Sequence, residues 1–186
     1  MDLGLDGKRA IVTGGSRGIG FAIARSLAAE GVDVALAARN AESLELAAKT
    51  LAQETGRRVI GIPTDTGDDA AVRALVRRAV DELGGVDILV NAAATPWSAG
   101  KPTDFASTTD DVVRAEVEIK VLGYLRTARA VAPHLIGQGW GRIINISGLG
   151  ARQANSIAQT VRNVGVSALT KNLADELGPK GINVTV

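Results

Sequence analysis

Short apolar segments alternate with longer segments of helical periodicity along the chain. The apolar segments are rich in Val and Ile and do not alternate with polar residues, which is typical of strands buried on both faces. They comprise residues 9–14, 32–38, 58–63, 86–93, 141–147 and 181–186. The helical segments carry apolar residues at three- and four-residue spacing, and several end at Gly. They comprise residues 20–31, 41–56, 68–85, about 109–137 and about 156–178. This order predicts an α/β fold with helices on both faces of a parallel sheet.

The size of the chain agrees with one domain. Its 186 residues correspond to about one domain, and a hydrophobic content of 46% suffices for a core. No repeat, low-complexity tract or linker divides the sequence. We therefore expect residues 1–186 to form a single domain.

Composition excludes several classes of function. The 21 basic and 20 acidic residues are mixed along the chain, so nucleic acid and anionic membranes are not expected partners. No run of ~18 apolar residues predicts a membrane span, and the N-terminal segment does not resemble a secretory leader. We expect a cytoplasmic protein. The absence of Cys and the single histidine, His134, argue against a metal site or a Ser-His-Asp triad.

A glycine-rich segment, "TGGSRGIG" (Thr13 to Gly20), leaves the first strand and opens the first helix. Glycines there permit a tight turn, and the helix N-terminus presents free N–H groups to a pyrophosphate. The motif alone also fits a purely structural turn, and its spacing is not G-x-G-x-x-G. As a phosphate loop it makes candidate cofactor-binding residues of Gly14, Ser16, Arg17, Gly18, Ile19 and Gly20.

The end of the second strand, "ALAARN", bears on the choice of dinucleotide. A carboxylate there would accept a hydrogen bond from the ribose 2′-hydroxyl of NAD and repel a 2′-phosphate. The sequence instead has Ala38 followed by Arg39, and Arg17 adds a second guanidinium from the glycine loop. Guanidinium groups match phosphate oxygens. We therefore expect NADP(H) in preference to NAD(H), the alternative being that both arginines are solvated surface residues.

Taken together, these motifs resemble the short-chain dehydrogenase/reductase family. Thr13, Gly14, Gly18 and Gly20 match the family's T-G-x-x-x-G-x-G, and "TD", "GGVDILVNAAA", "GRIINIS" and "ALTKNLADELGPKGINV" follow in the family's order. The resemblance covers nearly the whole chain. It implies a three-layer, doubly wound Rossmann fold with strand order 3-2-1-4-5-6 and an oxidoreductase acting on a small alcohol or carbonyl substrate. It also implies that the cofactor-binding residues include Asp65, Thr66, Asn91 and Ala92.

The residues that carry the family's chemistry are altered. Aligning "ALTKNLADEL" puts Gln159 and Asn163 at the positions of the catalytic tyrosine and lysine. The catalytic serine corresponds to Gly148 or, failing that, to Ser147. The asparagine that supports the lysine corresponds to Lys120. Glutamine has no proton that titrates near neutral pH, so it cannot replace a phenol as an acid–base group.

Two interpretations remain open. In the first, the chain is a catalytically inactive NADP(H)-binding module, such as a sensor or partner subunit. In the second, catalysis uses other groups, and the candidate catalytic residues are Ser147, Lys120, Gln159 and Asn163. The lysine and asparagine of the family are exchanged here, so the Lys120 ammonium could contact the nicotinamide ribose or polarise a carbonyl. Tyr124, four residues beyond Lys120, could supply a phenol or could be a packing or interface aromatic.

The resemblance raises two further expectations. Family members continue beyond the sixth strand into a loop that contacts nicotinamide, a substrate-covering segment and a last strand, which this sequence is expected to lack.

Family members also pair through their fourth and fifth helices. The segment 109–137 is apolar over more than one face. We therefore expect a homodimer or homotetramer, with Val117 and Tyr124 as interface candidates.

Overall fold

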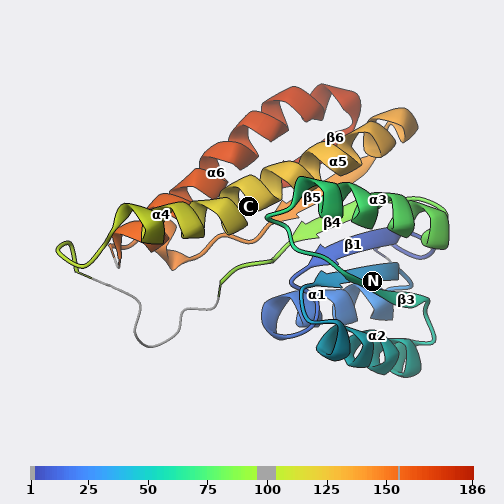
Figure 1. The fold of residues 1–186 in the computed structure, drawn as a ribbon. Helices are drawn as coiled ribbons and strands as arrows, with labels where there is room; N and C mark the ends of the chain where they lie inside the picture. The colour runs from blue at the N-terminus through green and yellow to red at the C-terminus, as the bar shows by residue number, and fades with distance from the viewer. Residues whose placement is uncertain (1–2, 96–103, 155) are drawn as a thin grey trace.

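The computed structural model describes residues 3–95, 104–154 and 156–186. These residues form a six-stranded parallel sheet in the order β3-β2-β1-β4-β5-β6, which confirms the predicted fold class and strand order (Figure 1). The strands are β1 (Arg9–Thr13), β2 (Asp33–Ala38), β3 (Val59–Pro63), β4 (Ile88–Asn91), β5 (Gly141–Asn145) and β6 (Ile182–Thr185).

Successive strand residues face opposite sides of the sheet, so β1 to β5 contribute to two apolar cores, whereas β6 buries Ile182 and Val184 in one core only. In β1, Ile11 joins the core beneath α3 (Asp69–Leu83), α5 (Gly123–Gln138) and α6 (Ile157–Leu177). Its neighbours Ala10 and Val12 join the core beneath α1 (Gly18–Ala29) and α2 (Ala41–Thr55). This explains why the strands read as continuous apolar runs in the sequence. Figure 1 shows α1 and α2 on one side of the sheet and the other helices across it.

Segment 109–137 differs from the single regular helix that its periodicity predicts. The structure divides it into α4 (Asp110–Val117), a π-helical turn over Glu118–Leu122, and α5. The residues at both ends of the π turn keep right-handed helical dihedral angles, so the helix continues through it. A π turn inserts residues into the helical register and re-aims the side chains that it carries, and such turns are frequent at functional sites. Lys120 lies in this turn.

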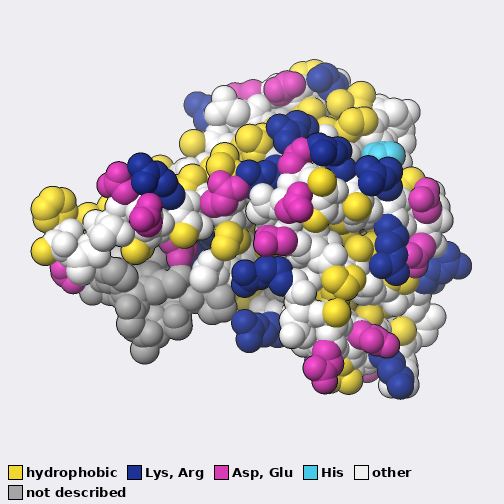
Figure 2. All heavy atoms as spheres, in the orientation of Figure 1, with side chains coloured by type: hydrophobic (Ala, Val, Ile, Leu, Met, Phe, Trp, Pro, Cys, Tyr) yellow, Lys and Arg dark blue, Asp and Glu magenta, His cyan; other side chains and the backbone are white. Residues whose placement is uncertain are grey.

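Acidic and basic side chains are interspersed over the face shown in Figure 2, and several form surface ion pairs, including Arg25–Glu54 and Arg78–Glu82. Within the described ranges, no helix is long and apolar enough to cross a membrane. His134, the single histidine, is exposed on α5.

Candidate functional site

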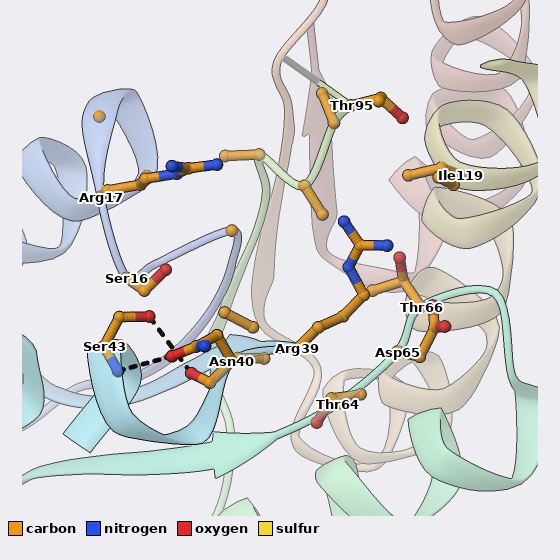
Figure 3. A pocket seen from close by; sticks show the side chains of 18 of the residues that line it. Ser16, Arg17, Arg39, Asn40, Ser43, Thr64, Asp65, Thr66, Thr95 and Ile119 are labelled. Atoms are coloured by element: carbon orange, nitrogen blue, oxygen red, sulfur yellow. Dashed lines mark hydrogen bonds between the residues drawn. The ribbon is translucent and has the colours of Figure 1, made fainter.

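A pocket of about 1200 Å³ lies at the carboxyl ends of β1, β2, β3 and β4 (Figure 3). This edge is where open α/β sheets bind their ligands. The predicted cofactor-binding residues that line the pocket are Gly14, Ser16, Arg17, Gly18, Ile19, Gly20, Arg39, Asp65, Thr66 and Ala92. Further lining residues, which the sequence did not single out, are Asn40, Ser43, Thr95 and Ile119.

The glycine loop forms one wall of this pocket, and its glycines are required by geometry. Gly14 has φ +69°, and a Cβ there would lie 2.8 Å from the backbone oxygen of Ala92. A Cβ on Gly20 would lie 2.4 Å from the backbone oxygen of Gly14. Thr13 joins this loop to the segment after β4, because its hydroxyl accepts hydrogen bonds from the Ala92 and Ala93 amides at 3.1 and 3.2 Å.

The first turn of α1 faces this loop without a side-chain cap. Arg17 occupies the N-cap position of α1, and its side chain makes no capping hydrogen bond. The first amides of α1 are therefore not satisfied by a capping side chain, which suits an anion.

Arg17 and Arg39 are both exposed and extend into the pocket from two different walls (Figure 3). Neither guanidinium group makes a hydrogen bond or an ion pair with another described residue. Asn40, which follows Arg39, is engaged as the N-cap of α2, where its side chain accepts a hydrogen bond from the Ser43 amide at 2.8 Å. The pocket therefore presents two guanidinium groups without a carboxylate partner, an arrangement suited to phosphate oxygens.

The side chain of Asn91, a predicted cofactor-binding residue, does not line the pocket. It is fully buried, and its amide donates a hydrogen bond to Asn145 Oδ1 at 2.9 Å. Its carbonyl oxygen accepts from Thr127 on α5 at 2.7 Å, and the Asn145 amide continues the chain to Thr170 on α6 at 3.0 Å. Since a buried polar side chain requires partners, the side-chain groups of Asn91 are used within the fold. The network ties α5 and α6 to the sheet.

The predicted catalytic residues gather behind the pocket, at the junction of the π turn, α6 and the end of β5. The ammonium of Lys120 donates hydrogen bonds to Asn163 Oδ1 and to the backbone oxygen of Ser147, both at 3.0 Å. Lys120 and Asn163 are 5% and 3% exposed. The contact between these two side chains, which the exchange of family residues predicts, is therefore present. Burial, reinforced by the nearby Arg162 guanidinium and opposed by Glu116, lowers the pKa of Lys120 to about 8.

A buried ion pair adjoins this lysine and was not anticipated from the sequence. Arg162 on α6 donates to the carboxylate of Glu116 on α4, and it also lies 3.5 Å from the backbone oxygen of Thr95, which lines the pocket. Both side chains are buried. Among the described residues, Arg162 Nε has no hydrogen-bond partner. The sequence did contain a signal for this pair. Glu116 lies one helical turn before Lys120, and Arg162 directly precedes Asn163, so both charged residues fall on helix faces that should be apolar.

The remaining candidate residues are buried or already hydrogen-bonded within the fold. The Ser147 hydroxyl donates to the Asn163 backbone oxygen at 3.1 Å, so it is satisfied locally. Gln159 is buried on α6. Tyr124 is 1% exposed, donates to the Ile146 backbone oxygen at 3.2 Å, and has a pKa raised by burial. The phenol of Tyr124 is therefore a packing group inside one protomer, which corrects its expectation as an interface residue.

Gly148, which aligns with the family's catalytic serine, is exposed beside the Lys120–Asn163 contact. A Cβ at this position would lie 3.1 and 3.2 Å from the side-chain nitrogen and oxygen of Asn163. A side chain at Gly148 would therefore press on the Asn163 amide, which is 3% exposed. No group of three His, Cys, Asp or Glu side chains suited to a metal occurs in the part of the chain that the structure describes.

Comparison with known proteins agrees with this geometry. The family model for short chain dehydrogenases matches residues 8–186. An uncharacterized oxidoreductase of Staphylococcus aureus is 34% identical over 183 residues, which cover 97% of this chain and 76% of the relative. The crystal structure of L-sorbose reductase from Gluconobacter frateurii complexed with NADPH and L-sorbose is 33% identical, with a TM-score of 0.92 over 99% of this chain and 69% of that chain. NAD+-bound xylitol dehydrogenase is 30% identical, with a TM-score of 0.90 over 97% of this chain and 68% of that chain.

Proposed function

The chain belongs to the short chain dehydrogenase family, and from that premise we propose that it is an NADP(H)-dependent oxidoreductase that interconverts an alcohol and a carbonyl compound. The observation that carries the proposal is the pocket at the carboxyl edge of the sheet, with its uncapped helix N-terminus and two arginines without ion-pair partners among the described residues. A bound dinucleotide would supply or accept the hydride. The glycine loop would hold its pyrophosphate, Asp65 would bind the adenine amino group as in the family, and Thr66 would contribute to the same cofactor site.

The preference for NADP(H) rests on Arg39, with help from Arg17. One structural relative binds NADPH and another binds NAD+, so membership of the family does not decide between them. No carboxylate follows β2, where NAD-specific proteins place the acceptor for the ribose 2′-hydroxyl. Titration with NADPH and NADH, followed by cofactor fluorescence, tests this directly. Equal affinities would contradict the assignment.

The catalytic half of the proposal concerns Lys120, Asn163, Gln159 and Ser147, which lie together but differ from the family's usual set. The alternative is a catalytically inactive NADP(H)-binding module, favoured by Gln159 at the tyrosine position and by the burial of Tyr124. Turnover assays with NADPH and a set of aldehydes and ketones, and with NADP+ and alcohols, separate the two. Stoichiometric binding of NADPH without turnover of any of these compounds would favour the module.

We further propose that residues 1–186 act as one dinucleotide-binding domain and that the protein pairs through α5 and α6 as a homodimer or homotetramer. Ile157, Val161 and Val164 on α6 are 40–47% exposed and lie on one helical face, which supports pairing through this helix. Light scattering at micromolar concentration tests the assembly, and a monomer would count against it. A cytoplasmic location stays a prediction.

A further inference from the structure

We propose that Lys120 is the proton donor and acceptor of the reaction, in the role for which the family uses its tyrosine. This inference rests on the proposed oxidoreductase function and assigns the acid–base group that such a function requires. It depends on the arrangement of hydrogen bonds around the amine and on the state of every other candidate near it.

The other candidates are already engaged or cannot titrate. The hydroxyl of Ser147 donates to the backbone of Asn163, and the phenol of Tyr124 donates to the backbone of Ile146 while buried. Gln159 and Asn163 carry amides, which have no titratable proton near neutral pH. Among the described residues of this cluster, Lys120 is the basic group that can exchange a proton near neutral pH.

The surroundings of Lys120 suit both protonation states. Its two acceptors, Asn163 Oδ1 and the Ser147 backbone oxygen, are uncharged, and no carboxylate lies within ion-pairing distance of it among the described residues. A neutral amine has two N–H groups, so both would be used and its lone pair would occupy the remaining tetrahedral position. In the ammonium form, a third N–H points in that same direction. One position can therefore give or take a proton while the amine stays anchored.

The surroundings of the Lys120 amine, including two charged groups, bring its pKa closer to neutral pH. Glu116 and Arg162 approach it from α4 and α6, and Tyr124 lies on α5. Because Glu116 is paired with Arg162, its attraction for the ammonium is offset by the guanidinium, and burial is left as the dominant effect. The pKa of Lys120 is thereby lowered to about 8. A general acid–base group works best when its pKa lies close to the working pH.

The Lys120 side chain is 5% exposed and does not itself line the pocket, but residues beside it line the pocket or are exposed. Ile119, the preceding residue, lines the pocket. Gly148, which has no side chain, lies against the Asn163 amide and is exposed, whereas Asn163 itself is 3% exposed. During reduction, hydride would form the new C–H bond at the carbonyl carbon, the carbonyl π electrons would move to oxygen, and an N–H bond of the Lys120 ammonium would break to form the O–H bond. The products are the alcohol, a neutral Lys120 amine and the oxidised dinucleotide that would have supplied the hydride, and oxidation is the reverse.

The first test follows the proton without requiring turnover. In protein labelled with 13C-lysine, the Lys120 ε-carbon signal is assigned by its loss in Lys120→Arg and is titrated by NMR. We expect a midpoint near pH 8, well below the ~10.4 of ordinary lysines. A midpoint near the ordinary value would overturn the proposal, because the amine would then not release its proton in the working range.

The second test separates proton transfer from charge. Lys120→Arg keeps the cation but does not deprotonate, so we expect kcat to fall roughly 100-fold or more, while NADPH affinity stays within about threefold. For the unaltered protein, kcat for reduction should fall above about pH 8, and kcat for alcohol oxidation should rise through the same range. The probes are L-sorbose, benzaldehyde and butane-2,3-dione with NADPH, and xylitol with NADP+. Lys49→Arg, at an exposed position on α2, is the matched control.

The outcomes distinguish the two proposals. Turnover that survives in Lys120→Arg with an unchanged pH profile overturns the role of Lys120 and leaves the oxidoreductase function intact. NADPH binding by the unaltered protein without turnover of any probe overturns the oxidoreductase function and the role of Lys120 with it. Lys120→Met, which removes the amine, serves as a second variant if Lys120→Arg does not fold, and its missing signal then assigns the Lys120 ε-carbon for the titration of the unaltered protein.

Discussion

Replacing Lys120 by Met should change how the stability of the protein depends on pH. The pKa of Lys120 in the folded protein is about 8, against an ordinary value of 10.5, so the two differ by about 2.5 pH units. Between these values the unfolded chain binds more protons than the folded protein, and stability therefore rises with pH. Below pH 8 the folded protein carries the full cost of burying the ammonium, and that cost is relieved as the pH rises toward 10.5.

The size of this effect follows from the shift. At 1.36 kcal/mol per unit, 2.5 units correspond to about 3.4 kcal/mol. Screening by water that reaches the cluster reduces this to about 2 kcal/mol. We expect the unaltered protein to gain about 2 kcal/mol of unfolding free energy, relative to Lys120→Met, between pH 7.5 and 10.5. Loss of the two hydrogen bonds to Asn163 and Ser147 adds an offset of about 1 kcal/mol each that changes little with pH.

Urea unfolding at half-unit steps of pH measures the difference. The buried Tyr124, whose pKa is raised, loses its stabilising contribution as the pH rises above the unfolded value, but it is present in both proteins and cancels. Lys49→Met, which removes an exposed lysine, is the control and should run parallel to the unaltered protein. If the curves for Lys120→Met and the unaltered protein are also parallel across this range, the ammonium is not buried at a cost and the reasoning fails.

Three other substitutions test neighbouring parts of the structure. Arg39→Ala should reduce NADPH affinity roughly ten- to a hundredfold while leaving NADH affinity nearly unchanged, because one charge-assisted contact is worth about 1.5–3 kcal/mol; parallel fluorescence titrations measure both. Glu116→Gln should lower the free energy of unfolding in urea by about 3 kcal/mol, because it leaves the Arg162 guanidinium buried without its carboxylate; a loss below about 1 kcal/mol would contradict this. Gln159→Tyr alone should not raise NADPH-dependent turnover, because Lys120 is held by Asn163 and Ser147 rather than placed to lower the pKa of a phenol; a large gain would show otherwise.

The sequence predicted the fold because local and global signals agree. The alternation of buried strands with helices ending at Gly predicted a parallel sheet covered by helices on both faces. The strand order was predicted from the family resemblance. The π turn could not be predicted, since Glu118–Leu122 carries no proline or other local signal that separates it from a regular helix. Lys120 in this turn contacts Asn163 on α6, which is a tertiary contact that local sequence does not indicate.

The cofactor pocket was largely predictable, whereas the surroundings of the amine were not. Glycines in a strand–helix turn are restricted by backbone geometry, so their role can be read from spacing. Asn91 was assigned to the pocket by alignment, but the choice between facing the pocket and facing Asn145 depends on the buried network between β4, α5 and α6. The Glu116–Arg162 pair joins two helices far apart in sequence, and spacing alone does not bring them together.

The cost of this cluster bears on whether the altered site still works. Burying an ion pair is often no better for stability than filling the same space with apolar side chains, and a buried ammonium with a lowered pKa adds a further cost. A chain that needed only to bind a dinucleotide could fill the space behind the pocket with aliphatic residues. Instead, Glu116, Arg162 and Lys120 are buried there, and the amine is held by two uncharged acceptors beside an exposed glycine. Maintaining charged groups at such a cost is expected of a working site. The cluster therefore favours catalysis by an altered set of residues over an inactive binding module, and the titration of Lys120 is the measurement that bears most directly on that choice.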